Sequence, residues 1–338
     1  MRRVGDPVLV EVFRGSRIES RHCGAAAVVD TDGREVFALG DIGAPVFPRS
    51  AVKAFQALPL LESGAADRFS LNAAEIALAC SSHSGEPIHV ETARDILRKC
   101  GRDVDALECG VHWPIGVDAA RALAARGATP SALHNNCSGK HAGFICLSCA
   151  AGLEPSGYVA PEHLVQREVK AAVEGLTKTR LDEDSRATDG CAIPTYAMPL
   201  KALALGFARF GAGHGLAAAR AAATRRIREA VAAHPALLAG AGRFDTVTTQ
   251  TFGLRVFAKT GAEGVYCAAF PELGLGVAIK CLDGATRAAE TAMAALIARF
   301  LPLSEKERGA LAPRLAPLIH NWNGAIVGQI QASAALTG

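Results

Sequence analysis

The sequence lacks the features that mark membrane, secreted or nucleic-acid-binding proteins. Its longest apolar-rich run, residues 142–155, is too short to span a bilayer. Gly5, Asp6 and Pro7 interrupt the stretch where a signal peptide needs continuous apolar residues. The formal net charge is only +3, and the densest basic run, residues 224–229, is typical of a solvated helix face. We therefore expect a cytoplasmic protein that binds neither membranes nor nucleic acids.

A disulfide framework is also not expected. The ten cysteines of a cytoplasmic protein are expected to remain thiols, so packing, metal binding or catalysis must account for them. Cys146 and Cys149 form a Cys-x-x-Cys motif, but it lies in an apolar helical pattern without a second pair, which favours buried core thiols. Cys109 and His112 could share a metal, although core packing is the favoured interpretation there too.

Strand patterns are confined to two widely separated parts of the chain. Residues 25–39 predict a hairpin that turns at Asp32 and Gly33. Residues 253–284 predict three successive strands, and these should be antiparallel because no crossover helix separates them. Ala- and Leu-rich helical patterns dominate residues 50–240, and a further long helix is predicted over residues 285–301.

These patterns together predict an α+β fold in which an antiparallel sheet is built from both chain ends and a helical lobe is inserted between them. We expect one domain with two lobes. The sheet lobe should comprise about residues 1–48 and 245–338, and the helical lobe about residues 49–244.

Ser50 and Lys53 form a Ser-x-x-Lys pair where a loop is predicted to become a helix. Ser50 is expected at the N-cap or in the first turn, and residues three apart on a helix lie on one face. A serine hydroxyl becomes a nucleophile when a neighbouring base takes its proton, and a buried lysine can be that base. The alternative interpretation is a serine cap followed by a surface lysine.

Two other segments could complete such a site. Residues 78–87 place Ser81, Ser82 and His83 after an apolar helix, where they could donate to a substrate or simply cap the helix. Lys259 begins a Lys-Thr-Gly sequence at the end of a predicted strand. Ser-x-x-Lys on a helix followed by Lys-Thr-Gly on a strand is the arrangement of the serine β-lactamase and penicillin-binding fold.

Cys137 and Cys191 differ from the other cysteines because both stand in loops beside polar residues. Lys140 and His141 follow Cys137, and Asp189 precedes Cys191. Two thiolates could anchor Zn²⁺ with a third ligand from nearby. Spacing alone leaves this possibility open.

Five segments occur together and in one order: RSAVK, CSSHSGE, NNCSGKHAG, TDGCAIPT and AKTGAEG. In this combination the chain resembles the rhizobial-type, or class 3, L-asparaginases. The resemblance runs from about residue 20 to about residue 285 and is loose in the last fifty residues. It implies the serine β-lactamase-like fold and a homodimer.

The resemblance also implies roles for individual residues. Ser50 with Lys53 matches the nucleophile tandem of the family, and Ser82 with Lys259 matches a second Ser-Lys tandem. Its metal set matches Cys137, Lys140 and Cys191, an unusual zinc site that contains a lysine. Four further residues match positions that line the substrate site: Arg49, Asn136, His141 and Asp189. This chain has Ser81 where the family often has alanine, which leaves open which serine points inward.

The predicted activity is hydrolysis of L-asparagine to L-aspartate and ammonia through a Ser-Lys acyl-enzyme. Zn²⁺ is expected in a supporting role, since the serine already supplies the nucleophile. One alternative keeps the fold but acts on β-lactams or esters, and the apparent lack of a signal peptide argues against it. A second alternative is a zinc-binding regulator without enzymatic activity.

Overall fold

The computed structural model describes residues 6–338, which divide into two compact units. The sheet unit contains residues 6–51, 198–212 and 255–338, and the helical unit contains residues 52–197 and 213–254. The predicted lobes had their limits at 48/49 and 244/245. The structure differs mainly in residues 198–212, which group with the sheet although the prediction placed them in the helical lobe.

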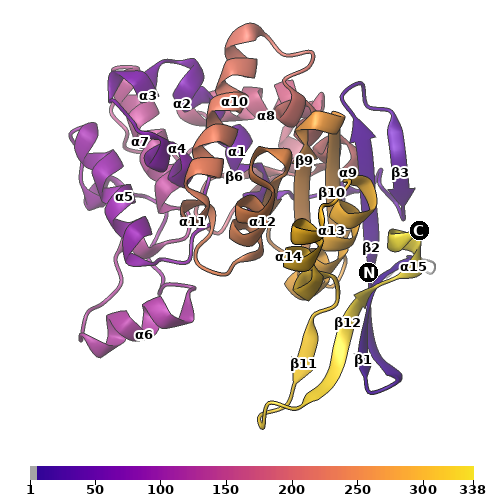
Figure 1. Cartoon of the computed structure of the whole chain (residues 1–338). Helices are drawn as coiled ribbons and strands as arrows, with labels where there is room; N and C mark the ends of the chain where they lie inside the picture. Colours follow the sequence, from indigo (N-terminus) through magenta and orange to yellow (C-terminus); the bar gives the residue numbers. More distant parts are fainter. Residues whose placement is uncertain (1–5) are drawn as a thin grey trace. The chain divides into compact units, whose positions relative to one another are not determined.

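One eight-stranded antiparallel sheet forms the centre of the sheet unit (Figure 1). Its strands follow the order β11-β12-β1-β2-β10-β9-β8, and β3 also pairs with β2. The bounds of the strands are β1 Val8–Arg14, β2 Arg17–Asp30, β3 Glu35–Leu39, β8 Phe257–Thr260, β9 Val265–Phe270, β10 Leu275–Cys281, β11 Leu318–His320 and β12 Ile326–Ala332.

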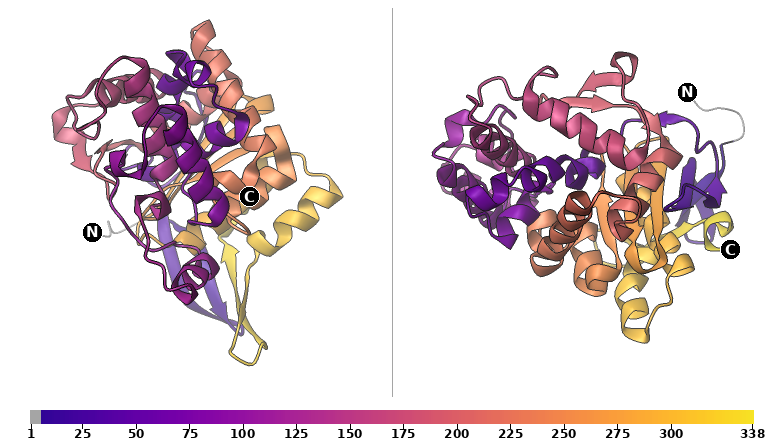
Figure 2. Two further views of the ribbon diagram at one scale, coloured as in Figure 1. Left: turned by 90° about the vertical axis from the view of Figure 1, so that its left-hand side faces the viewer. Right: turned by 90° about the horizontal axis from the view of Figure 1, so that it is seen from above.

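The strand β2 joins the two ends of the chain. Its first half pairs with β1, whereas the half that begins at Gly24 pairs with β10 and with β3. Residues 25–29 and every residue of β8 and β9 are buried, so helices must cover both faces of this part of the sheet. The helices α9 (Leu200–Ala212) and α13 (Thr286–Phe300) both pack against β9 and β10 (Figure 2).

Small residues allow α9 to approach the sheet closely. A side chain at Gly276 on β10 would collide with the backbone of Ala204 and Ala208 in α9. The rest of the sheet unit consists of α14 (Glu305–Leu315), α15 (Ala334–Thr337) and the short pair β4 (Pro45–Val46) and β7 (Met198–Pro199).

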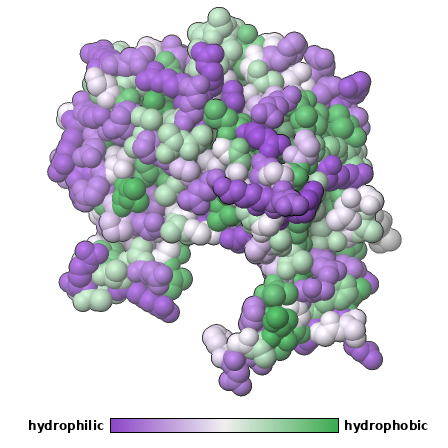
Figure 3. Space-filling model, viewed as in Figure 1, coloured by the Kyte–Doolittle hydropathy of each residue, from purple (hydrophilic) through white to green (hydrophobic). Residues whose placement is uncertain are grey.

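The hairpin of β11 and β12 forms one edge of the sheet and exposes apolar side chains. Leu318, Trp322 and Ile326 are all exposed, and apolar surface covers β11 in Figure 3. The sequence patterns predicted neither this hairpin nor β1. Each has a local turn signal that was missed, Gly15 between β1 and β2 and Asn323-Gly324 between β11 and β12. Only the pairing of β12 with β1 joins distant parts of the chain.

The helical unit packs its helices around α7 (Ser138–Ala150), whose residues are buried from Ser138 to Ser148. The helices α4 (Ala73–Ala79) and α5 (Pro87–Lys99) pack against α7, and Asn72 with Glu75 forms a capping box at the start of α4. The remaining elements are α1 Lys53–Gln56, α2 Leu58–Glu62, α3 Ala65–Arg68, α6 Val117–Ala125, α8 Leu164–Thr177, β5 Arg186–Thr188, β6 Pro194–Tyr196, α10 Ala218–Ala233, α11 Pro235–Leu238 and α12 Phe244–Phe252.

The structure confirms the predicted fold class. The hairpin over residues 25–39 is β2 and β3, the strands over residues 253–284 are β8, β9 and β10, and the helix over residues 285–301 is α13. None of the helices within residues 6–338 is long and apolar enough to cross a membrane.

Candidate active site

Ser50 lies in a short 3-10 turn, η1 (Arg49–Val52), which leads directly into α1. Of the two predicted positions, the N-cap or the first turn, Ser50 does not take the N-cap but lies in the 3-10 turn that leads into α1. Val52 occupies the N-cap position of α1, and no side chain caps this helix. Because α1 contains only four residues, its dipole adds little to the stabilisation of a developing alkoxide.

The backbone is strained immediately before Ser50. Arg49 has φ = 51°, in the left-handed region that non-glycine residues rarely adopt. The carbonyl of Pro48 accepts a hydrogen bond from the amide of Ala51, which closes the turn. Strained residues of this kind cluster at functional sites, where the surrounding structure holds them in place.

The glycine of the Lys-Thr-Gly sequence supports this turn. A Cβ atom at Gly261 would stand only 2.7 Å from the carbonyl oxygen of Pro48, so a larger residue could not be accommodated there. The end of β8 therefore lies against the turn that carries Ser50. Lys259, two residues earlier on β8, is completely buried, and its Nζ donates to the carbonyl of Thr260 at 3.2 Å.

Lys53 is buried, with only 1% of its surface exposed. Its Nζ donates hydrogen bonds to the backbone carbonyls of Ser81, at 2.7 Å, and of Asn136, at 3.3 Å. It also hydrogen-bonds the thiol of Cys137. The prediction of a buried lysine at this position is confirmed, and the contacts fix Nζ with respect to two other predicted segments of the site.

The segment that contains Ser81 and Ser82 leaves α4 and is buried throughout residues 81–85. The Oγ atom of Ser81 is buried and has no hydrogen-bond partner among residues 6–338. Ser82 is buried as well, and its backbone amide donates to the carbonyl of Leu238 at 3.0 Å. This segment therefore supplies two buried hydroxyls.

His83 organises the same segment, although the sequence assigned it no separate role. Its Nδ1 accepts a hydrogen bond from the amide of Gly85 at 3.1 Å, so Nε2 carries the proton and donates to the Oγ of Ser138 at 2.9 Å. Burial lowers the pKa of His83 well below its usual value. The hydroxyl of Ser138 in turn donates a hydrogen bond to the carbonyl of Leu133 at 2.9 Å. These bonds connect the segment to the first turn of α7.

The three predicted metal ligands are brought together and are all buried. Cys137 is the N-cap residue of α7, Lys140 lies in the first turn of that helix, and Cys191 follows β5 in the loop that leads to β6. The Nζ of Lys140 donates to the Sγ of Cys191 at 3.0 Å, and the two thiols hydrogen-bond each other.

Electrostatics within this cluster favour one thiolate. The hydrogen bond from Cys191, helped by the charges of Lys53 and Lys140, holds the pKa of Cys137 well below its usual value despite burial. The same hydrogen bond, together with burial, raises the pKa of Cys191. Burial opposes the charge of Lys140, but Cys191, Cys137 and Asp189 outweigh it and raise its pKa.

The donor set fits Zn²⁺, which binds thiolate sulfur and nitrogen. Cys137, Cys191 and Lys140 provide two sulfurs and one amine nitrogen in mutual contact. Over residues 6–338, no cluster of three His, Cys, Asp or Glu side chains has the geometry to hold a metal, so such a site depends on Lys140. Cys109 and His112, the alternative pair, instead bond to the backbone of Ala132 and Asn136.

His141 lies deep in the helical unit beside the predicted ligands. The hydroxyl of Tyr158 accepts from the amide of Glu108 and is 2.7 Å from the Nδ1 of His141. The Nε2 of His141 is buried and has no hydrogen-bond partner among the described residues. An unpaired buried polar atom costs about 1–3 kcal/mol, which a bound ligand could recover. Tyr158 gave no recognisable signal in the sequence.

The other two predicted substrate residues of the helical unit belong to the same cluster. Asn136 is half-buried, and its backbone carbonyl accepts from Lys53 and from the amide of His83. Asp189 is half-buried, and its Oδ1 accepts from the amide of Cys191 at 3.3 Å. Both residues therefore shape the backbone around the predicted metal ligands.

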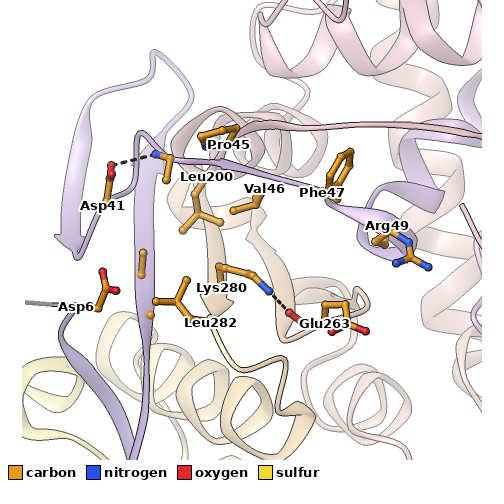
Figure 4. A pocket seen from close by; sticks show the side chains of 13 residues that line it. Asp6, Asp41, Pro45, Val46, Phe47, Arg49, Leu200, Glu263, Lys280 and Leu282 are labelled. Atoms are coloured by element: carbon orange, nitrogen blue, oxygen red, sulfur yellow. Dashed lines mark hydrogen bonds between the residues drawn. The ribbon is translucent and has the colours of Figure 1, made fainter. Parts of the chain in front are cut away.

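The sheet unit contains a cavity of about 370 Å³ that Arg49 lines (Figure 4). Apolar side chains of Val46, Leu200 and Leu282 form part of its wall. The ammonium group of Lys280 donates to the carbonyl of Glu263 in this cavity. The remaining lining residues are Asp6, Gly24, Ala25, Asp41, Ala44, Pro45 and Phe47.

The family profile of L-asparaginase II matches residues 10–332, which is nearly the whole chain. The chain belongs to the L-asparaginase II family. Membership identifies it as an asparaginase enzyme, a hydrolase, and confirms the predicted resemblance to rhizobial-type asparaginases. The family profile extends to residue 332 and so covers most of the last fifty residues, where the motifs showed only a loose resemblance to the family.

Comparisons with other proteins give more distant similarities. None of the curated proteins compared with the chain matches it. Among solved structures, a β-lactamase from Mycobacterium bovis (Mb2281c) has 15% identity and a TM-score of 0.39, and the match covers 79% of this chain and 89% of that one. Mglu in its native form has 15% identity and a TM-score of 0.34, with 92% and 67% of the two chains covered.

Proposed function

We propose that this member of the L-asparaginase II family hydrolyses L-asparagine to L-aspartate and ammonia through an acyl-enzyme on Ser50, with Lys53 as the base. The observation that carries the proposal is the environment of Lys53. Its Nζ is buried, follows Ser50 by one turn, and is held by the carbonyls of Ser81 and Asn136.

In the first step the Oγ of Ser50 attacks the side-chain amide carbon of the substrate, and Lys53 takes the hydroxyl proton. A neutral amine has two N–H groups and one lone pair. The neutral amine can donate to the two carbonyls only, so its lone pair takes the place of the N–H that donates to Cys137 when Lys53 is charged. Backbone N–H groups of the strained turn at Arg49 and Ser50 would stabilise the oxyanion.

The leaving ammonia needs a proton, and the acyl-enzyme then needs an activated water. We assign both transfers to the second tandem, Ser82 with Lys259, acting as relay and base. Both side chains are buried. The contact between Gly261 and Pro48 supports this assignment for Lys259, since it fixes the end of β8 against the Ser50 turn.

Substrate recognition is assigned to Arg49, Asn136, His141 and Asp189. The guanidinium of Arg49 suits a carboxylate, and the carboxylate of Asp189 suits the substrate's ammonium group. The unpaired Nε2 of His141 supplies a further polar contact.

A zinc ion is proposed as a structural cofactor held by Cys137, Lys140 and Cys191. When bound it supplies a fixed positive charge and an anchor for the loops that carry these residues. The homodimer implied by the resemblance and the cytoplasmic location expected from the sequence are also part of the proposal. Light scattering on the purified protein tests the dimer.

The decisive experiment measures ammonia release from L-asparagine, with L-glutamine and a chromogenic β-lactam alongside. We expect release from L-asparagine by the wild-type protein and its loss in Ser50→Ala. Ser156→Ala is the matched control, because this serine is exposed and distant in sequence from every assigned residue. Intact mass under rapid quench should show an aspartyl adduct on the wild-type chain.

Retained activity in a folded Ser50→Ala protein would overturn the nucleophile assignment. An adduct that maps to Ser82 would exchange the roles of the two tandems. Turnover of the β-lactam without any ammonia release from asparagine would contradict the proposed substrate.

A further inference from the structure

Three cysteines outside the proposed active site lie together in the helical unit. Cys100 is the C-cap residue of α5, whereas Cys146 and Cys149 belong to the last two turns of α7. The Sγ of Cys100 donates to the carbonyl of Leu97 at 3.2 Å, and the Sγ of Cys146 donates to that of Ile96 at 3.6 Å. Both sulfurs therefore contact the same turn of α5.

The helices α5 and α7 (Figure 1) pack against each other, and the third thiol, that of Cys149, lies beside Cys100 as well. The thiol of Cys100 hydrogen-bonds the thiols of both Cys146 and Cys149. Sequence patterns predicted that Cys146 and Cys149 are buried core thiols. The prediction holds for Cys146 and is wrong for Cys149, which, like Cys100, is half-exposed.

A cation stands beside the accessible thiols. The guanidinium of Arg102 hydrogen-bonds the thiol of Cys149 and pairs with the carboxylate of Glu154 at 3.1 Å. A small polar oxidant can thus reach two adjacent thiols next to a positive charge. Reactive cysteines are typical of such partly exposed, electropositive surroundings.

We propose that Cys100 and Cys149 form a peroxide-sensitive thiol pair, in which Cys100 is oxidised first and Cys149 then closes a disulfide with it. This modification site is independent of the proposed amidohydrolase chemistry, because none of its residues has a role there.

The chemistry balances with hydrogen peroxide as the oxidant. The sulfur of Cys100 attacks one peroxide oxygen, the O–O bond breaks, and the departing oxygen leaves as water after it gains the thiol proton. This leaves a sulfenic acid on Cys100. The sulfur of Cys149 attacks that sulfur, the S–S bond forms, and the S–O bond breaks. A second water leaves with the proton of Cys149, so two thiols lose two electrons and one peroxide gains them.

The order of the two steps follows from the local charges. The hydrogen bond from Cys146 lowers the pKa of Cys100 against the effect of burial, and Cys149 and Arg102 contribute to the shift. Burial raises the pKa of Cys149. A larger fraction of Cys100 than of Cys149 is therefore present as thiolate, which is the form that reacts with peroxide. Cys146 donates to the carbonyl of Ile96 and is shielded from solvent.

Metal binding is a less suitable role for this cluster. Within residues 6–338, no three His, Cys, Asp or Glu side chains are placed to hold a metal ion. A redox role requires only two adjacent sulfurs with access to solvent, and Cys100 and Cys149 meet both conditions.

The test is peroxide titration of the purified, zinc-loaded protein, followed by alkylation and peptide mapping without reduction. We expect the peptides of Cys100 and Cys149 to become joined, with loss of two hydrogens in mass and full reversal by dithiothreitol. In Cys149→Ser, dimedone should label Cys100 as a trapped sulfenic acid. The matched control is Cys23→Ser, because Cys23 is also half-exposed but lies on β2 of the other unit. This variant should form the same disulfide as the wild-type protein.

Two results would overturn the proposal. One is a Cys100 that stays reduced at a peroxide concentration that already oxidises Cys23. The other is a disulfide between Cys137 and Cys191 formed while Cys100 and Cys149 remain thiols. If Cys149→Ser does not fold, brief peroxide exposure of the wild-type protein with dimedone present replaces it. Absence of label from Cys100 there counts against the proposal.

Discussion

The side-chain nitrogen of Lys53 donates a hydrogen bond to the backbone carbonyl oxygen of Ser81 at 2.7 Å. Lys53 begins α1, and Ser81 begins the segment that contains Ser82 and His83. One buried atom therefore links the turn after Ser50 to the segment that carries the second serine. A bond of this kind keeps the amine in one position and removes the side-chain freedom that a surface lysine would have.

Replacing Lys53 with methionine should abolish most of the asparaginase activity without unfolding the protein. Loss of a positioned base lowers rates on the order of 10²- to 10⁴-fold. Lys53→Arg should not restore activity, since a guanidinium stays protonated and cannot accept the serine proton. Initial rates of ammonia release measure the effect, and circular dichroism monitors folding.

Lys306→Met is the matched control for the same assay, because Lys306 is exposed on α14 of the sheet unit. It should leave the rate unchanged. An active Lys53→Arg protein would contradict the role of Lys53 as the base.

Loss of a predicted metal ligand should lower the zinc content of the protein. We expect Cys191→Ser to lose most of its zinc on dialysis and Lys140→Met to retain it more weakly, since two thiols remain in that variant. Elemental analysis after dialysis gives the stoichiometry. Cys23→Ser, on β2, is the control and should keep the wild-type zinc content. Equal zinc in Cys191→Ser and the wild-type protein would exclude this ligand set.

Zinc affinity should also rise with pH. The pKa values of Cys191 and Lys140 are raised in the metal-free protein, so both groups must release protons before they can bind. Linkage then predicts an increase of up to about tenfold in affinity per pH unit for each proton released. Competition with a chromophoric chelator at several pH values measures this slope. An affinity independent of pH would show that no proton leaves on binding.

Sequence patterns could predict the main architecture because its signals are local. Turn residues such as Asp32 and Gly33 mark the hairpin of β2 and β3, and short glycine-containing turns mark β8 to β10. The segments assigned to the proposed active site were recognisable for a related reason. Each motif is short, contiguous and placed at the end of an element.

Features that depend on tertiary contacts could not be predicted in this way. The left-handed backbone of Arg49 results from its surroundings, because no local sequence preference favours that conformation for arginine. Pairing of β12 with β1 joins residues that are more than three hundred positions apart. Cys149 has an apolar sequence context but is half-exposed, since it lies at the end of α7 where packing stops.

Close packing requires a glycine at position 139, between the predicted metal ligands Cys137 and Lys140. A Cβ atom there would collide with the backbone carbonyl of Leu78 and with its side chain, because α4 and α7 pack closely at this point. We expect Gly139→Ala to lower the free energy of unfolding by about 1–3 kcal/mol through overpacking. Displacement of Lys140 should also weaken zinc binding.

The comparison variant is Gly309→Ala in α14, where a new Cβ atom would meet nothing within 4 Å. That substitution should stabilise the protein by about 0.5–1 kcal/mol, as expected for alanine in a helix interior. Urea unfolding measures both free energies. Equal effects of the two substitutions would show that the contact with Leu78 is not tight.

His83 should make the stability of the protein depend on pH below neutrality. Its ring accepts from Gly85, donates to Ser138 and stacks on His89 with ring centroids 4.9 Å apart, so the neutral form is required. Burial lowers the pKa of His83 in the folded state, whereas an unfolded histidine has a pKa of about 6.5. The unfolded chain therefore binds the proton first. The stabilising contribution is complete above about pH 6.5 and is lost as the pH falls below it, by up to about 1.4 kcal/mol per pH unit for one histidine.

The variant His83→Gln should remove this part of the slope, whereas His320→Gln, at an exposed position of β11, should not. Free energies of urea unfolding between about pH 5 and about pH 8 provide the measurement. Titrating carboxylates add to the slope in all three proteins, so the difference between variants isolates His83. A slope for His83→Gln equal to that of the wild-type protein would mean that the ring is already protonated, or solvated, in the folded state. In either case the hydrogen bond from Gly85 to Nδ1 could not persist in solution.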